Sequence, residues 1–202
     1  MTNLVARSKP QQERSRRRVD LILDKAEQLV METGFESVTT QMISKQTDIS
    51  PGVIYHYFPG KHGIFAAVAD RAFRNLEVRM SNIYAKASSD EPFEILIDKI
   101  VDDLAIYWRS NKAAILMWQA LEHSRRMDPV TSVLKQKGIQ RNAALLKCYF
   151  PSLPKARIKT KAMIMQEICF CLLRQTITTK RRESARIIQE LKLMLKSLMS
   201  EC

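Results

Sequence analysis

The scarcity of glycine and proline constrains this chain more than any other feature of its sequence. Its 202 residues include only five glycines and seven prolines, and every proline after the first can be placed at a helix start or in a short connection. Apolar residues recur at helical spacing, and no segment alternates apolar with polar residues as a strand would. The sequence therefore predicts an all-α protein without internal repeats.

Nine helices can be placed from this periodicity and from capping residues. Gly34 suits a left-handed helix end, Thr39 and Thr40 suit a helix start, and Ser50-Pro51 supplies a cap followed by a first-turn proline. The break at residues 88–92 separates the first four helices from the last five. The expected helices cover residues 16–33, 39–46, a short segment opened by Ser50-Pro51, 61–87, 93–109, 112–126, 129–150, 154–179 and 183–199.

Charge and apolar content narrow the class of protein. The chain has 33 Lys and Arg against 21 Asp and Glu, a net charge of +12. This excess favours a polyanionic partner such as nucleic acid or an acidic membrane surface, although a soluble protein that happens to be basic fits it as well. The longest apolar run, residues 168–173, is too short to span a bilayer, and residues 1–18 lack the apolar centre of a secretory signal. We therefore expect a cytoplasmic protein.

Neither a metal centre nor a common enzyme site is predicted. The four cysteines lack zinc or disulfide spacing and are interpreted as reduced thiols rather than redox sensors, and the three histidines have no neighbouring ligand cluster. Five glycines leave no dinucleotide fingerprint, no phosphate-binding loop and no nucleophile elbow. We expect no catalytic residues and no cofactor, while a Ser/His/Asp site assembled from scattered residues stays open as an alternative.

The most informative functional segment is residues 39–61, TTQMISKQTDISPGVIYHYFPGK. They describe a short helix, a tight turn at residues 47–49 and a second short helix, which is the helix-turn-helix arrangement. The second helix of such a motif lays its first turn in the major groove, and here that turn is Pro51-Gly52-Val53, small enough for close approach. Lys61 stands at the start of the next helix, where its charge and the exposed backbone N–H groups suit a phosphate.

This segment resembles the amino-terminal pattern of the TetR/AcrR family of bacterial transcriptional regulators. It departs from the pattern at Ser44, at residues 47–49 and at His62. Asp48 takes a turn position that favours a left-handed backbone, which Asp tolerates at modest cost. The matching residues are Thr39, Thr40, Ile43, Ser50, Gly52, Tyr55, Tyr57, Phe58 and Lys61, with Gly34 and Phe35 in the expected place upstream.

The resemblance implies two sets of DNA contacts. Base-edge or groove contact is implied for Gln41, Pro51, Gly52, Val53 and Tyr55, and phosphate contact for Thr40, Ser50, His56 and Lys61. Four arginines just before the motif are expected to approach the DNA backbone or minor groove, with a solvated basic tail as the alternative. They are Arg14, Arg16, Arg17 and Arg18.

The resemblance also implies that a small molecule binds among the middle helices and changes the spacing of two DNA-binding heads. Ordinary core packing is the alternative role for the candidate pocket residues, which are Tyr107, Trp108, Met117, Trp118, Leu121, His123, Tyr149, Gln166 and Phe170. Apolar positions on the last two helices suit a homodimeric four-helix interface, or packing inside one subunit. These are Ile168, Leu172, Ile187, Ile188, Leu191, Met194, Leu195 and Leu198.

The expected organisation is a basic arm over residues 1–18, a helix-turn-helix domain over 19–62 and a ligand-sensing and dimerisation domain over 63–202, with the helix at about 61–87 carrying the boundary. The expected function is a homodimeric, ligand-responsive repressor that binds a palindromic DNA operator. A helical protein-interaction adaptor that retains the helix-turn-helix for packing is the alternative. Sequence-specific, salt-dependent DNA binding would separate the two.

Overall fold

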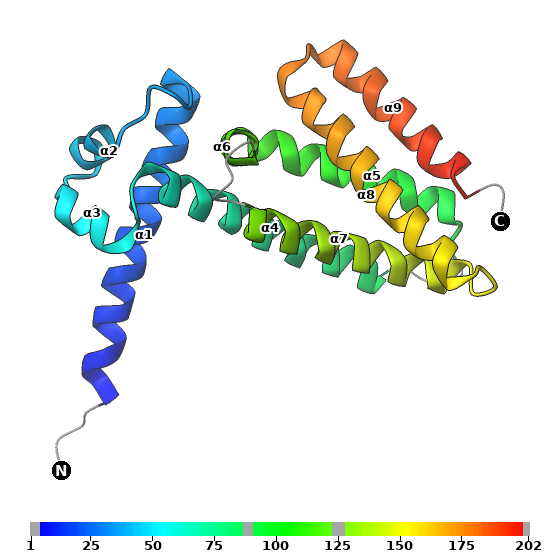
Figure 1. The fold of residues 1–202 in the computed structure, drawn as a ribbon, viewed down its shortest axis with the longest axis horizontal. Helices are drawn as coiled ribbons and strands as arrows, with labels where there is room; N and C mark the ends of the chain where they lie inside the picture. Colours follow the sequence, from blue (N-terminus) through cyan, green and yellow to red (C-terminus); the bar gives the residue numbers. More distant parts are fainter. Residues whose placement is uncertain (1–4, 87–90, 123–127, 200–202) are drawn as a thin grey trace. The chain divides into compact units, whose positions relative to one another are not determined.

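The computed structural model describes residues 5–86, 91–122 and 128–199, and within these ranges the regular structure is entirely helical (Figure 1). This confirms the all-α prediction. The helices are α1 Val5–Thr33, α2 Thr40–Thr47, α3 Pro51–Tyr57, α4 Lys61–Lys86, α5 Phe93–Ser110, α6 Lys112–Glu122, α7 Asp128–Tyr149, α8 Lys155–Thr178 and α9 Arg181–Ser197.

The chain divides into two compact units, and the division falls inside α4. Unit 1 consists of Met1–Ala72 and Ala113–Arg125, and unit 2 consists of Phe73–Lys112 and Arg126–Cys202. Unit 1 therefore holds α1 to α3, the first part of α4 and most of α6. Unit 2 holds the rest of α4 together with α5, α7, α8 and α9.

Local chemistry sets the helix ends where the sequence predicted them. Gly34 ends α1 with φ +83°, and its N–H donates to the Val30 carbonyl at 3.0 Å. The Thr39 hydroxyl caps α2 by accepting from the Met42 N–H at 3.2 Å. Pro51 opens α3, where its fixed φ suits the first turn and its missing N–H costs nothing.

Two helices begin two or more residues earlier than the sequence predicted. Helix α1 begins at Val5 instead of Arg16, and α9 begins at Arg181 instead of Glu183. Residues 11–18 are Gln, Glu, Arg and Ser, none of which stops a helix, so the helix continues through this part of the segment that we expected to precede it. The four arginines of the expected arm therefore lie on α1.

The core of unit 1 joins α1 to the short helices and to the start of α4. Ile22, Ile43, Ile54 and Phe65 are fully buried there. Arg71 of α4 also forms ion pairs with three carboxylates of α1, Asp20 at 3.9 Å, Asp24 at 2.8 Å and Glu27 at 2.7 Å. Because burial of apolar area drives folding, these side chains hold the two short helices of unit 1 in place.

In unit 2, α8 and α9 form a hairpin against α5, and α7 packs on α8 (Figure 1). Two ion pairs fix the direction of α9 along α5, because Lys192 pairs with Asp102 and Lys196 pairs with Asp98, each at 2.7 Å. The two helices therefore run antiparallel. None of the helices in the described ranges is both long and apolar enough to cross a bilayer.

A polar cluster joins α4, α7 and α8 inside unit 2. The Tyr84 hydroxyl donates to Asn142 Oδ1 at 3.0 Å, and Asn142 Nδ2 donates to Gln166 Oε1 at 3.4 Å. Arg141 lies 5.6 Å from the centre of the Tyr84 ring and pairs with Glu77 at 2.7 Å. Removal of the Tyr84 hydroxyl from water raises the pKa of Tyr84 to about 12, with Arg141 opposing the shift.

Candidate nucleic-acid interface

Helix α3 has one face in the core and one face in solvent. Ile54 and Phe58 are buried and fix the helix against unit 1. Pro51, Gly52 and Tyr55 are exposed on the other side, with Tyr55 at 57% of its full exposure. An exposed large aromatic side chain beside a first turn without bulk is the surface that a recognition helix needs.

The turn between α2 and α3 holds because each of its unusual residues is accommodated locally. Asp48 adopts φ +55° and ψ +27°, which confirms the left-handed position expected from the sequence. The Ser44 hydroxyl donates to the Ile49 carbonyl at 2.7 Å and ties α2 to the turn. The buried Thr47 hydroxyl donates to the Ile43 carbonyl at 2.8 Å, so it is satisfied inside α2 and does not disturb the packing.

The residues expected to reach base edges do not share one environment. Gln41, Pro51, Gly52 and Tyr55 are exposed, whereas Val53 is half-buried. The Tyr55 hydroxyl lies 3.2 Å from the Thr40 hydroxyl, which positions the ring across the start of α2. Four of the five residues are therefore open to a ligand, and Val53 contributes more to packing.

Three of the residues expected to reach phosphates, Thr40, Ser50 and Lys61, lie at the starts of α2, α3 and α4, whereas His56 lies in the last turn of α3. Ser50 is exposed, and its hydroxyl makes no capping bond to α3, so it is available to an anion. His56 is exposed, and its ring meets Tyr57 edge to face at 5.3 Å between centroids. Lys61 Nζ donates to the Glu36 carbonyl at 3.2 Å and lies 5.6 Å from the centre of the Phe35 ring, which orients the ammonium group.

A hydrogen bond that the sequence did not predict links α1 to α3. Ser15 donates to the Tyr57 hydroxyl at 3.1 Å across 42 residues of chain. The neighbouring arginines Arg14, Arg16, Arg17 and Arg18 are all exposed, and Arg17 pairs with Glu13 at 2.6 Å. No local sequence pattern predicts the hydrogen bond to Tyr57, because only the fold brings these two residues together.

The candidate pocket residues fall into both units. In unit 2, Tyr107 and Trp108 are buried, and the Trp108 ring meets Phe170 edge to face at 4.8 Å. Tyr149 is half-buried, 5.5 Å from the Phe93 ring.

The other candidates include Gln166, which is half-buried in the polar cluster of unit 2. Met117 and Trp118 are buried on α6 and belong to unit 1. His123 and the side chain of Leu121 lie outside the described residues.

The expected dimer surface needs a correction. Leu191 and Leu195 are 0% and 1% exposed, so unit 2 itself encloses them and they cannot also face a partner. Met194 is 46% exposed, and its exposed neighbour Leu193 was missed because it lies off the main apolar stripe. Met163 of α8 is exposed as well. The remaining expected positions are half-buried, and these are Ile168, Leu172, Ile187, Ile188 and Leu198.

Both parts of the chain match models of known protein families. Residues 22–68 match the family model described as bacterial regulatory proteins, tetR family. Residues 92–198, more than half of the chain, match the model described as the tetracyclin repressor-like C-terminal domain.

Curated relatives are similar over parts of their length. The HTH-type transcriptional regulator BetI of Stenotrophomonas maltophilia is 26% identical over 141 residues, which cover 67% of this chain and 70% of BetI. The nucleoid occlusion factor SlmA of Glaesserella parasuis is 28% identical over 80 residues, which cover 40% of this chain and 38% of SlmA.

Solved structures share the fold. A putative TetR-family transcriptional regulator from Syntrophomonas wolfei has a TM-score of 0.72 at 15% identity, over 91% of this chain and 95% of that one. The fatty acid degradation regulator FadR of Bacillus halodurans has a TM-score of 0.70 at 15% identity, over the same shares. Together with the two family models, this all-helical fold and its amino-terminal helix-turn-helix show that the chain belongs to the tetR family of bacterial regulatory proteins and is a transcriptional regulator with a helix-turn-helix DNA-binding domain.

Proposed function

We propose that this regulator is a homodimeric repressor that places α3 of each subunit in the major groove of a palindromic operator and responds to a small-molecule effector. The observation that carries the proposal is the exposed first turn of α3. Gly52 has no side chain there, and Tyr55 follows on the same exposed surface. A first turn of this kind lets the backbone approach base edges closely.

Phosphate contacts would fix the register of α3 on the duplex. Thr40, Ser50 and Lys61 offer hydroxyl and ammonium groups at the starts of three successive helices, where backbone N–H groups also favour anions, and His56 offers an imidazole in the last turn of α3. The arginines of α1 would add contacts to the backbone or the minor groove. A regulator of this kind would act in the cytoplasm, where bacterial DNA lies.

Dimerisation would cover the apolar surface that α8 and α9 leave exposed. Leu193 and Met194 of α9 are 58% and 46% exposed, and Met163 is exposed on α8. Covering this surface with a second copy removes apolar area from water and presents two α3 helices to two half-sites about 34 to 36 Å apart.

The dimer has a direct test with a matched control. Substituting Leu193→Glu and Met194→Glu together should shift the protein from dimer to monomer in sedimentation velocity at micromolar concentration. Ile106→Glu, at an α5 position that is equally exposed, should leave the dimer intact. A wild-type protein that is already monomeric, or a dimer that survives both glutamates, would contradict this part of the proposal.

The effector would bind in unit 2 beside the aromatic pair of Trp108 and Phe170. Their rings provide apolar walls, and Gln166, one turn before Phe170 on α8, provides a polar group. An effector that binds one spacing of the two heads better than the other would shift the equilibrium and release the operator. Phe170→Ala should weaken this release while leaving operator affinity in the absence of effector unchanged.

The DNA-binding part of the proposal is tested by selecting bound duplexes from a random pool. Wild type should enrich one palindrome, and both Tyr55→Ala and Gln41→Ala should weaken the enrichment. Met31→Ala removes an exposed apolar side chain of α1 outside the helix-turn-helix and serves as the control. If no duplex is enriched at modest salt, the proposal fails, and the interpretation of the chain as a protein-interaction adaptor gains support.

A further inference from the structure

The positive charge of this protein is concentrated away from its helix-turn-helix. Residues 1–72 hold 10 Lys and Arg against 8 Asp and Glu, a net charge of +2. Residues 126–202 hold 16 Lys and Arg against 5 Asp and Glu, a net charge of +11. Nearly all of the excess of +12 therefore belongs to the part of the chain that forms α7, α8 and α9.

One end of the α8–α9 hairpin gathers part of this charge without neutralising it. Four exposed cations stand there, Lys180, Arg181, Arg182 and Arg186, and we call them the basic end of α9. Within the residues that the structure describes, none of their side chains makes an ion pair. Lys192 and Lys196, further along α9, pair with carboxylates of α5 instead.

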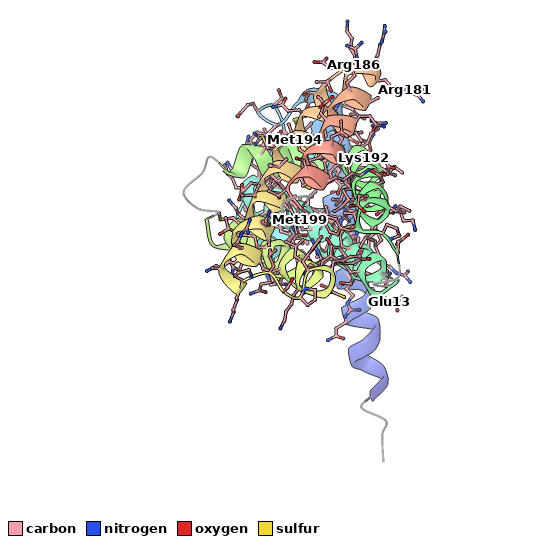
Figure 2. The ribbon with its side chains drawn as sticks, turned by 90° about the vertical axis from the view of Figure 1, so that its right-hand side faces the viewer. Glu13, Arg181, Arg186, Lys192, Met194 and Met199 are labelled. Atoms are coloured by element: carbon pink, nitrogen blue, oxygen red, sulfur yellow. The ribbon has the colours of Figure 1, made fainter. Side chains whose placement is uncertain are left out.

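Figure 2 shows where the two labelled arginines of the basic end lie. Arg181 and Arg186 lie together at one end of α9, apart from Met194 and Met199 further along the helix. The amino end of α9 adds the positive end of a helix dipole, and Glu183 is the single acidic residue of its first turn. Four unpaired cations at this helix end repel one another, and a polyanion would relieve that repulsion.

The position of the basic end within unit 2 follows from the pairing of α9 with α5. Because the two helices run antiparallel, the start of α9 lies toward the carboxyl end of α5. From that end of α5 the chain passes through Lys112 to Ala113 of unit 1. The basic end and one of the three points at which the chain passes between the units, Lys112 to Ala113, therefore belong to the same end of unit 2.

The residues around the basic end indicate which polyanion fits. Residues 178–186, TTKRRESAR, contain no aromatic side chain on which a base of single-stranded nucleic acid would stack, and no large apolar side chain to enter a membrane or anchor a protein interface. Arginine binds phosphate oxygens through two parallel N–H bonds. The phosphate backbone of a double-stranded nucleic acid fits this surface, because it binds arginine through its phosphates and needs neither a stacking ring nor an apolar anchor.

We propose that the basic end of α9 contacts the phosphates of duplex DNA, as a second and sequence-independent DNA contact outside the helix-turn-helix. The contact adds to affinity for every duplex and does not distinguish one sequence from another. It goes beyond the proposed function, because it assigns DNA binding to the sensing half of the chain.

The salt dependence of binding tests this proposal in the full-length protein. Each phosphate that a cation neutralises contributes about 0.9 to the slope of log K against log salt. Replacing Arg181, Arg182 and Arg186 by Gln should therefore reduce the steepness of that slope by about 2 to 3 per chain on a mixed-sequence duplex. Lys155→Gln, Arg157→Gln and Lys159→Gln remove the same charge from the exposed start of α8 and should leave the slope unchanged.

Three outcomes would overturn the inference. An unchanged slope in the arginine variant would be the first, and an equal reduction of the slope in the two triple variants would be the second, because it would show a diffuse electrostatic field instead of a contact. Loss of binding to vesicles of anionic lipid, with duplex binding intact, would assign the surface to a membrane. Failure of the proposed function is distinguishable, because Tyr55→Ala tests sequence selectivity and does not alter the basic end.

Discussion

Gly52→Ala should separate the stability of this protein from its affinity for DNA. Gly52 lies in the first turn of α3, and a Cβ built there meets no atom within 4 Å. The methyl group therefore costs no packing energy in the free protein, and Ala loses less backbone entropy in a helix than Gly does. Because the position is in the first turn of a short helix, we expect the lower end of the usual gain, about 0.5 kcal/mol.

The same methyl group would stand between α3 and the major groove. A displaced recognition helix loses contacts worth about 1 to 3 kcal/mol for each good side-chain contact to a base, so the loss of one such contact should raise Kd for the selected duplex about 5- to 150-fold. Hydrogen exchange of residues 39–58 measures the stability, and fluorescence anisotropy measures Kd. Unchanged Kd with a stable fold would refute the close approach, and a loss of protection in α3 would refute the reasoning about open space.

Three further predictions follow from single residues. At the left-handed turn, Asp48→Gly and Asp48→Asn should keep the protection of α2 and α3 in hydrogen exchange, whereas Asp48→Val should cost about 1 to 2 kcal/mol; equal effects would contradict the strained backbone. Tyr84 ionises near pH 10 when unfolded and at about 12 when folded, so its contribution to the free energy of unfolding is complete below pH 10 and is lost as pH rises toward 12. Tyr84→Phe should abolish this alkaline decrease in the free energy of unfolding, at most about 2 to 3 kcal/mol, when urea-unfolding curves are compared across that pH range. An unchanged alkaline decrease in the variant would be the contrary result. Burial raises the pKa of the Cys169 thiol to about 12, so iodoacetamide at pH 8 should label the exposed Cys148 and Cys171 first; peptide mass spectrometry that finds all three labelled together would contradict this.

Local chemistry explains why much of the site could be predicted from the sequence. Gly34 and Asp48 mark left-handed turns, and Thr39 and Pro51 mark helix starts, because each depends on the conformational preference of one residue. These four residues confine α2 and α3 to a short span, and Ile54 then decides which face of α3 is buried. The nine helices were placed by the same local rules and by apolar periodicity.

Features that depend on distant contacts could not be predicted in this way. Apolar periodicity finds a buried stripe but not what covers it, so Leu191 and Leu195 were assigned to a dimer surface although α9 buries them within its own unit. The bond from Ser15 to Tyr57 spans 42 residues and leaves no local signal. The uneven charge is visible in the sequence, but only the structure shows which cations are unpaired.

Methylation interference on the selected duplex tests the central claim most directly. Dimethyl sulfate methylates guanine N7 in the major groove and adenine N3 in the minor groove, so it reports which groove the protein enters. If α3 of each subunit reads the major groove, methylated N7 should block binding at two clusters of guanines whose centres lie about one helical turn apart, and Gly52→Ala should weaken binding at both. Interference at adenine N3 alone, or at no base, would contradict the assignment of α3 as the recognition helix.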